Sequence, residues 1–322
     1  MRRFALYLFL AVIATSTMDR LLGMFLEHLH DRSLEGQNGG DLNRYLAQPR
    51  PDILVIGSSR AHHHVIPDSL SPTAYNLSHN GMSVAFQAGL VAVLDQYDAM
   101  PTRVLLLHVD PEEALMDQAG GDIRFLRRYY GSVPYVTDRI NGLHPLERCA
   151  FWSDVHRFNG MVPGLLRAWW GPAAPRTAQG RGYVQRPDQP TDATRTLHTA
   201  EKDSVNAATY AARWSEELFR EGIGAPLDHI DSVCRSRGVS LILFTSPRYR
   251  TTAAREAFNA RARAALGPHR RWVMPQGPEV EQLRDIRFWR DNVHLRHDGA
   301  RLFSASLAAS LALPDTNRTT TP

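Results

Sequence analysis

The chain has 322 residues, of which 43% are hydrophobic and 22% are charged. This length and composition allow a sizeable buried core, which excludes wholesale disorder and favours one large domain or two small ones. The formal net charge is only +4 and no basic run is interleaved with aromatic residues, so we do not expect nucleic acid as a partner. The cysteines Cys149 and Cys234 fit no metal spacing; one disulfide and two free thiols both remain open.

The N-terminal segment combines a positive start with an apolar run. Arg2 and Arg3 precede residues 4–14, which contain no charged residue. This pattern is typical of an export signal, although the run alone is shorter than the ~20 residues of a membrane span. Because the small-residue cleavage signature is poor, we favour an uncleaved signal anchor over residues 1–30 rather than a cleaved signal peptide or a buried soluble helix. The positive-inside rule then predicts a single-pass protein of the cell inner membrane with its main domain in the periplasm.

The rest of the chain alternates short apolar runs with segments of helical spacing. Residues 31–50 are polar and contain glycines, which favours a juxtamembrane linker. The alternation over residues 51–313 predicts an α/β domain with a doubly wound, flavodoxin-like parallel sheet flanked by helices. The expected strands are 52–56, 74–77, 103–109, 239–244 and 271–274, and the expected helices are 83–97, 206–237, 255–266 and 298–313.

Residues 120–205 form an expected helical and irregular insertion in this domain. The part over 124–170 has a mostly helical pattern and is rich in Arg, Tyr and Trp, whereas 171–200 contains several prolines and glycines. The aromatic residues can stack on sugar rings or pack the inserted helices against the sheet, and both interpretations stay open. The polar tail 314–322 is expected to fray. The aromatic residues concerned are Trp152, Trp169, Trp170, Tyr129, Tyr130 and Tyr135.

Two short motifs from opposite ends of the domain suggest a catalytic site. Ser58 and Ser59 follow the first expected strand, and ligands bind doubly wound sheets at the carboxyl ends of their strands. Asp291 precedes His294 by three residues, a spacing at which a carboxylate can hold an imidazole in one tautomer. Ser59, His294 and Asp291 are therefore the parts of a Ser-His-Asp site, which occurs in several chain orders on unrelated folds. The alternative is that the serines only cap a helix.

Two further features lie directly after the serines. Arg60 can bind an anionic polymer, or it can brace the turn by hydrogen bonds to backbone carbonyls. His62, His63 and His64 are adjacent, and adjacent residues of a helix point in different directions, so they make a poor joint metal site. We expect them to face solvent or to line the rim of the cleft, and we expect neither a metal nor a cofactor.

On these residues the chain resembles the SGNH (GDSL-like) hydrolase superfamily over about 50–110 and 235–313. It looks most like the membrane-anchored branch, which serves O-acetylation of bacterial polysaccharides and D-alanylation of teichoic acids beside a multi-spanning membrane acyltransferase. The resemblance implies that the third residue of the first block, Ser59 rather than Ser58, is the nucleophile. It also implies an oxyanion hole formed by the backbone of Ser59 and by Gly81.

One block departs from the family pattern. The third block normally contains an Asn that donates to the oxyanion, but this chain has His108, Val109 and Asp110 at that place. Asn80 and Asn76 are the candidates to replace this donor.

The resemblance implies extracytoplasmic transfer of an acyl group, most simply acetyl, to or from a bacterial surface polysaccharide through a serine acyl-enzyme. The implied partners are the polysaccharide and a multi-spanning membrane O-acyltransferase. A secreted carbohydrate acetylesterase is one alternative, because the same triad serves water and sugar acceptors alike. A non-catalytic polysaccharide-binding accessory protein of an O-acyltransferase is the other.

Overall fold

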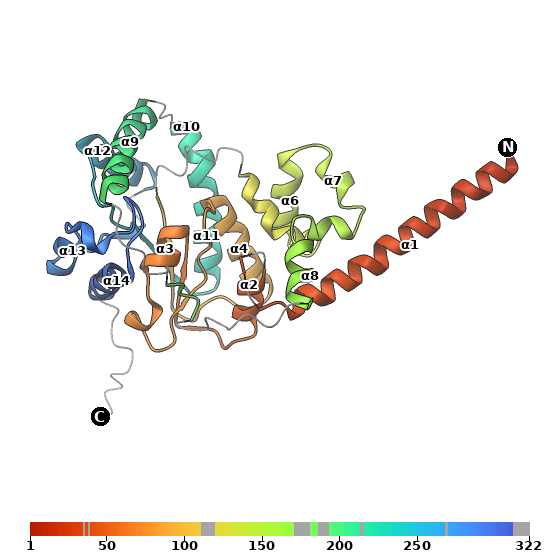
Figure 1. The fold of residues 1–322 in the computed structure, drawn as a ribbon, viewed down its shortest axis with the longest axis horizontal. Helices are drawn as coiled ribbons and strands as arrows, with labels where there is room; N and C mark the ends of the chain where they lie inside the picture. Colours follow the sequence, from red (N-terminus) through yellow and green to blue (C-terminus); the bar gives the residue numbers. More distant parts are fainter. Residues whose placement is uncertain are drawn as a thin grey trace.

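The computed structural model describes residues 1–34, 36–37, 39–110, 120–170, 181–185, 193–212, 216–267 and 270–311. Within this part of the chain, five parallel strands form one sheet in the order β2-β1-β3-β4-β5, which is the flavodoxin-like order. The predicted α/β class with a parallel sheet flanked by helices is therefore confirmed (Figure 1). The strands are β1 (Ile53–Ile56), β2 (Tyr75–Asn76), β3 (Val104–His108), β4 (Ser240–Phe244) and β5 (Arg271–Val273).

Both faces of the sheet are covered by helices. Even-numbered residues of β1 pack into a core with α4 (Val84–Gln96) and α11 (Ala225–Ser236). Odd-numbered residues pack into a second core with α3 (Ser59–His64) and α14 (His297–Leu311). All four residues of β1 are buried, which explains why this strand is a continuous apolar run rather than an alternating one.

The segment predicted as a helix over 206–237 is helical up to Ser236 wherever the structure describes it. Residues 206–212 belong to the end of α9, and residues Glu216–Ser236 are helical without a break through a π-helical turn at Arg220–Gly224. Pro226 follows this turn and has no N–H for the helical hydrogen-bond pattern, which agrees with the local widening. The remaining elements are α2 (Gly40–Leu46), η1 (Pro67–Ser69), η2 (Gly121–Tyr129), α6 (Pro134–Leu143), α7 (Glu147–Ala150), η3 (Val155–Phe158), α8 (Val162–Trp170), α9 (Ala193–Ala212), α10 (Glu216–Phe219), η4 (Arg220–Gly224), α12 (Ala253–Ala265), α13 (Pro278–Gln282) and η5 (Ile286–Phe288).

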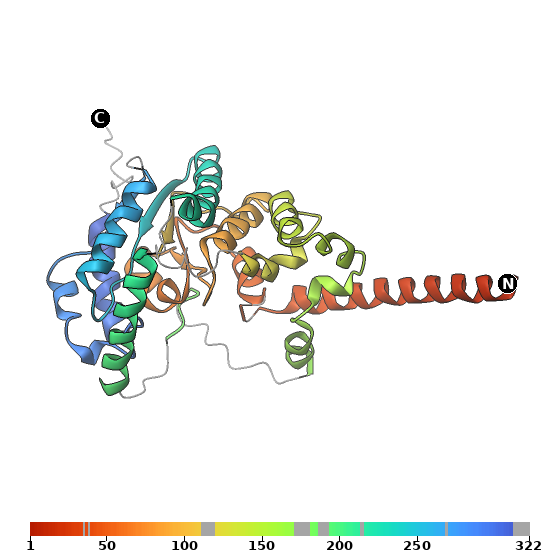
Figure 2. The ribbon, with the colours of Figure 1, turned by 90° about the horizontal axis from the view of Figure 1, so that it is seen from above.

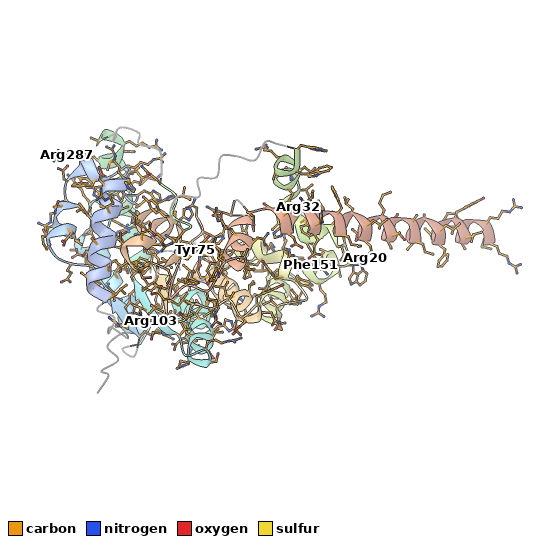
Figure 3. The ribbon with its side chains drawn as sticks, turned by 90° about the horizontal axis from the view of Figure 1, so that it is seen from below. Arg20, Arg32, Tyr75, Arg103, Phe151 and Arg287 are labelled. Carbon is orange, nitrogen blue, oxygen red and sulfur yellow. The ribbon has the colours of Figure 1, made fainter. Side chains whose placement is uncertain are left out.

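The N-terminal helix α1 (Arg2–Arg32) projects far from the body of the molecule (Figures 1 and 2). Of the helices that the structure describes, α1 is the one long and apolar enough to cross a membrane. Its second half is docked, because Leu26 and Leu29 pack against residues of η3 and α8. Figure 3 shows Arg20 on the projecting helix and Tyr75 in the body of the α/β domain.

Within the segment 31–50, predicted as a linker, helix α2 packs against the domain. This helix buries Leu42 and Tyr45, and the Tyr45 hydroxyl donates a hydrogen bond to the Ala99 carbonyl at 2.7 Å. Asn43 Nδ2 donates to the His30 carbonyl at 2.7 Å and so ties α2 to the end of α1. Because the segment is polar overall, its composition did not indicate that two of its apolar residues would be buried and hold a helix of two turns.

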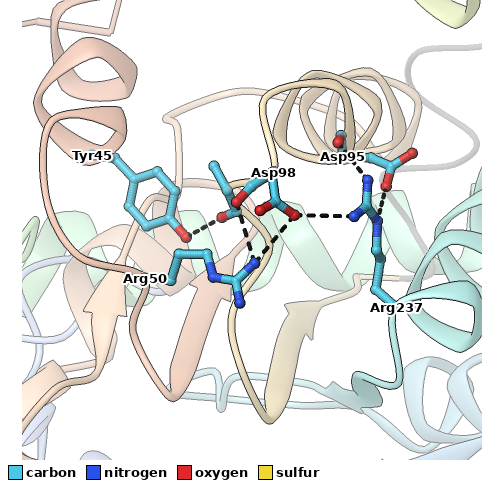
Figure 4. A network of polar contacts seen from close by, with 6 residues as sticks. Tyr45, Arg50, Asp95, Asp98 and Arg237 are labelled. Atoms are coloured by element: carbon cyan, nitrogen blue, oxygen red, sulfur yellow. Dashed lines mark hydrogen bonds and ion pairs between the residues drawn. The ribbon is translucent and has the colours of Figure 1, made fainter.

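A polar network of Tyr45, Arg50, Asp95, Asp98 and Arg237 lies near the amino ends of β1, β3 and β4 (Figure 4). Arg50 Nη1 donates to Asp98 Oδ1 at 3.2 Å, and Arg237 pairs with Asp95 at 2.5 Å and with Asp98 at 3.0 Å. Exposed ion pairs of this kind contribute little to stability, because water and salt screen them. The network is therefore a modest structural clamp at the amino ends of the strands.

The aromatic residues of the insertion divide into two groups. Tyr130 stacks on Phe151 with ring centroids 3.7 Å apart, and Tyr135 stacks on His229 at 3.9 Å. Tyr129 is buried as well, so these tyrosines serve packing. The three tryptophans of the insertion are exposed: Trp152, Trp169 and Trp170.

The two cysteines are both free. Cys149 is exposed on α7, whereas Cys234 is buried in α11. Burial raises the pKa of the Cys234 thiol to about 12, so this residue behaves as a small apolar side chain. Much of the predicted irregular stretch 171–200 and the predicted tail 314–322 lie outside the described residues.

Candidate active site

Ser59 begins α3 directly beyond the carboxyl end of β1. Gly57 makes the turn between them with φ of +151°, and a Cβ at this position would lie 2.5 Å from the Cβ of His108. Only glycine fits this backbone and this space. The Ser59 N–H lies in the first turn of α3, where N–H groups have no acceptor within the helix. The nucleophile candidate thus lies where doubly wound sheets bind ligands.

The structure brings Ser59, His294 and Asp291 together. Ser59 Oγ lies 3.0 Å from His294 Nε2. His294 Nδ1 lies 3.0 Å from each carboxylate oxygen of Asp291. With the Nδ1–H donated to Asp291, Nε2 is left to accept the proton of the Ser59 hydroxyl, which is the tautomer that a general base needs.

The carboxylate of Asp291 is stabilised in its ionised form. It accepts hydrogen bonds from the backbone N–H groups of Val293 at 3.0 Å and His294 at 2.9 Å. Burial raises the pKa of this carboxyl, but the bond and charge of His294 and the two backbone donors outweigh burial and lower the pKa to about 2. Asp291 is therefore an anion at neutral pH.

His64 fixes the loop that carries His294. Its Nε2 accepts a hydrogen bond from the Leu295 N–H at 3.0 Å, and its ring contacts the buried rings of Trp289 and Phe303. Burial lowers the pKa of His64 well below its usual range, so this imidazole is neutral and able to accept. The prediction that all three adjacent histidines face solvent or the cleft rim is wrong for His64, which is buried.

His62 and His63 lie at a cavity of about 440 Å³ next to the triad. Each donates its Nδ1–H to a backbone carbonyl: His62 to Ser78 at 2.7 Å and His63 to Val184 at 2.9 Å. Ser59, His62 and His63 share one face of α3 by their i, i+3 and i+4 spacing, so this face leads from the cavity to the nucleophile candidate.

The walls of this cavity come from segments that the sequence did not predict to be functional. One wall is formed by residues 36–37 together with Asp41, Arg44 and Gln48, and the other by residues 181–184. They were expected to be a linker and an irregular stretch, and no local pattern reveals that both fold over α3. The polar side chains on the walls are Gln37, Asp41, Arg44, Gln48, Asn80 and Arg181.

Asn76 is not an oxyanion donor, contrary to expectation. Its Nδ2 donates both protons, to the carbonyls of Ala61 and Val65, each at 2.9 Å. Its Oδ1 accepts a hydrogen bond from the Ser78 N–H at 3.1 Å. The side chain is therefore fully used in holding the end of α3 below the candidate site.

Gly81 and Asn80 lie in the turn after β2, the strand next to β1. This turn is tied to the serine turn by a bond from the His79 N–H to the Gly57 carbonyl at 2.9 Å. Gly81 is exposed with φ of +73°. The Asn80 N–H donates to Gln37 Oε1 at 3.1 Å, while its side chain lines the cavity. Both remain candidates for oxyanion donors.

Arg60 braces the site and does not face it, which corrects the predicted substrate contact. Its side chain is only 4% exposed and forms an ion pair with Asp110, which also pairs with Arg248 at 2.7 Å. The ion pairs link α3 to the segments that follow β3 and β4.

His108 is the last residue of β3 and lies beside the serine turn. Its Nδ1 lies 3.4 Å from the Ser58 hydroxyl oxygen. Burial, followed by the charges of Arg60 and Arg248, lowers the pKa of His108 well below its usual range. The neutral imidazole of His108 thus contacts the turn that carries Ser58.

The buried ion pair gives a prediction for stability. We expect Arg60→Met to lower the free energy of unfolding by about 3 kcal/mol, the low end for breaking a buried pair, because Arg248 still contacts Asp110. Denaturant unfolding of the protein in detergent measures this, with Arg50→Met at the exposed network as the control. Equal midpoints for Arg60→Met and the unmodified protein would contradict the assignment.

No protein-family model matches the chain, and none of the curated proteins matches it significantly.

Proposed function

We propose that the protein is an SGNH-type serine O-acyltransferase that acts outside the cytoplasm on a bacterial surface polysaccharide. The observation that carries this proposal is the 3.0 Å contact between Ser59 Oγ and His294 Nε2, with His294 Nδ1 bonded to the anionic Asp291. The parallel sheet, with the serine after its first strand and the Asp-x-x-His segment before its last helix, agrees with the resemblance. The transferred group is acetyl in the simplest case.

In the first half-reaction, Ser59 Oγ attacks the carbonyl carbon of an acyl ester while its proton passes to His294 Nε2. The carbonyl oxygen becomes an oxyanion that accepts hydrogen bonds from the backbone N–H groups of Ser59 and Gly81. Removing one such donor costs about 3–4 kcal/mol in comparable sites. The ester C–O bond then breaks, the leaving oxygen takes the proton from His294, and an acyl-Ser59 ester remains.

In the second half-reaction, a hydroxyl of the acceptor gives its proton to His294 Nε2 and attacks the acyl carbon. The bond to Ser59 Oγ breaks, and Oγ recovers the proton from His294. Asp291 stays ionised and stabilises the imidazolium that forms in each half. A sugar hydroxyl as acceptor gives transfer, and water gives hydrolysis.

The cavity beside His63 suits a neutral, hydroxyl-rich acceptor. Arg44 on its wall is compensated by Asp41 at 2.7 Å and also donates to the Tyr75 hydroxyl at 3.3 Å. Amide and carboxylate groups on the walls are hydrogen-bonding partners for sugar hydroxyls. The proposal therefore places the acceptor polysaccharide in this cavity and the acyl ester at Ser59.

The proposal includes a membrane position. Helix α1 would anchor the protein in the inner membrane, with Arg2 and Arg3 in the cytoplasm and the α/β domain in the periplasm. A multi-spanning O-acyltransferase beside α1 would supply the acyl group.

An acceptor-dependent assay tests the transferase. We expect nitrophenol release from nitrophenyl acetate to accelerate when a polysaccharide fragment is added, with acetylated fragment detected by mass spectrometry. Gln48→Trp places a bulky side chain at an exposed position of the cavity wall. It is expected to abolish the acceleration and to leave hydrolysis within about twofold, whereas Gln48→Ala retains both, since only the acceptor site is filled.

The alternatives give other results. Fast hydrolysis that no acceptor accelerates supports a carbohydrate acetylesterase. Polysaccharide binding without nitrophenol release, unaffected by Ser59→Ala, supports a non-catalytic accessory protein and contradicts the proposal.

A further inference from the structure

Helix α1 meets the inserted helices before it can complete a membrane span. A span needs ~20 residues, so one that starts at Phe4 ends near Gly23. Asp19 is already held by the insertion: Ser153 Oγ donates to its carboxylate at 2.5 Å, and the Asp154 N–H donates at 2.7 Å. If α1 crosses a membrane, the segment around Ser153 must therefore lie at the depth where α1 leaves the hydrocarbon core of the bilayer.

The docking of α1 on the insertion is tight. A Cβ at Gly23 would lie 2.5 Å from the Cβ of Asp154, so the helix backbone packs directly against this residue. Asp154 also pairs with Arg20 at 2.5 Å. On the other side, Arg128 pairs with Glu27 at 3.2 Å. These contacts make α1 and the insertion one rigid unit rather than a domain on a flexible tether.

Exposed tryptophans surround this junction. Trp152 is 78% exposed and adjoins Ser153, and Trp170 is 72% exposed. Trp169 is 53% exposed, contacts Phe25 of α1 edge-to-face at 5.5 Å, and lies 5.0 Å from Trp170. Tryptophan is enriched at membrane interfaces, where its apolar ring and its N–H are both accommodated.

The surface of α1 stays apolar at the same level. Met18, Leu21 and Met24 are all exposed. Residues 18–25 rise about 10 Å along the helix, which is comparable with the headgroup layer on one side of a bilayer. Exposed Arg148 and Arg167 on the inserted helices add positive charge that anionic headgroups attract.

We propose that residues 146–170 of the insertion rest in the lipid headgroup layer beside α1 and hold the α/β domain at a fixed height above the bilayer. The proposal rests on the membrane position proposed for α1, and its occupant is a phospholipid surface. Asn43 connects the end of α1 to the cavity wall through its bonds to the carbonyls of His30 and Ser33. The height of the candidate site above the membrane is thereby fixed as well.

Depth-dependent fluorescence quenching tests this proposal. The full chain is reconstituted into phosphatidylcholine–phosphatidylglycerol vesicles that carry bromine on the acyl chains near the glycerol. We expect strong quenching of tryptophan fluorescence, since the rings of Trp152, Trp169 and Trp170 lie within the interface. The quenched fraction is expected to fall at least about twofold when these three residues are together replaced by Phe. The matched control is Trp272→Phe on β5, which is expected to retain the quenching.

Vesicle flotation separates the two proposals. A protein that does not float with vesicles has no anchored α1, and both the membrane position and the headgroup contact then fail. If the protein floats but is quenched equally with and without the three tryptophans, the headgroup contact alone is overturned. The exposed tryptophans would then be assigned to contact with a protein partner. Labelling of Ser59 by a serine-directed phosphonate should be unchanged in the triple variant, which shows that its domain is folded.

Discussion

Replacing Ser59 with alanine is expected to lower the hydrolysis of nitrophenyl acetate by about 10³-fold or more. The variant has no hydroxyl to form the acyl-enzyme, whereas His294 and Asp291 keep their positions. Release of nitrophenol measures the rate, and mass spectrometry of the peptide that contains Ser59 measures labelling by a serine-directed phosphonate. Both signals should be lost together.

Ser58→Ala is the matched control for this experiment. Ser58 is the neighbouring serine, but it is buried, it makes no side-chain capping bond to α3, and its hydroxyl faces His108. We expect its loss to leave hydrolysis within about tenfold and labelling unchanged, since no reacting atom is removed. Labelling that survives Ser59→Ala but disappears in Ser58→Ala would show that the nucleophile has been misassigned.

The strands and the triad could be predicted because their signals are local. β1 is an apolar run bounded by Pro51 and Gly57, so its type and its end are evident from a few adjacent residues. The carboxyl ends of parallel strands lie at one edge of a sheet, so a serine after an early strand and a histidine in a late loop can be expected to meet. Ser59 and His294 meet in this way across 235 residues.

The supporting residues could not be predicted because their partners are distant in the chain. Arg60 next to the serine suggested a ligand contact, and nothing nearby showed that Asp110 would neutralise it. Asn76 had the right chemistry for an oxyanion donor, but the two carbonyls that occupy its amide become neighbours only when α3 folds over β2. Whether a side chain is buried, and whether all its hydrogen-bonding groups are already used, depends on the folded chain. A short sequence motif does not specify either property.

The pocket walls were missed for a related reason. Short polar segments carry too few apolar residues to show a helical period, yet α2 buries Leu42 and Tyr45 and is tied to α1 by Asn43. Residues 181–184 are placed by a few long-range bonds, such as those that the Arg181 carbonyl accepts from the Asn76 N–H at 2.9 Å and the Val184 carbonyl accepts from His63 at 2.9 Å. Where a segment is positioned by a few long-range contacts, composition predicts a loop and leaves its location open.

Asp291→Asn is expected to lower kcat on the order of 10³- to 10⁴-fold with little change in KM. An Asn can present its N–H₂ group to His294 Nδ1, which favours the tautomer with the proton on Nε2, and this tautomer cannot accept the Ser59 proton. The charge that stabilises the imidazolium is lost as well. Steady-state hydrolysis of nitrophenyl acetate measures the effect, and Asp285→Asn, a carboxylate exposed in the preceding segment, should keep full activity.

The same variant should change the acid stability of the protein. The folded-state pKa of Asp291 is about 2, below the ~3.9 of an unfolded aspartate, so the carboxylate adds stability that is fully present above about pH 4. That stability is lost as the pH falls through about 2, because protonation breaks the bonds from His294 and the two backbone donors. In Asp291→Asn no proton is taken up at this position. The denaturant midpoint of unfolding should therefore fall less steeply between pH 4 and pH 2 than it does for the unmodified protein. Full activity of Asp291→Asn combined with an unaltered acid transition would show that His294 is oriented by something other than this carboxylate, and the triad would lose its third member.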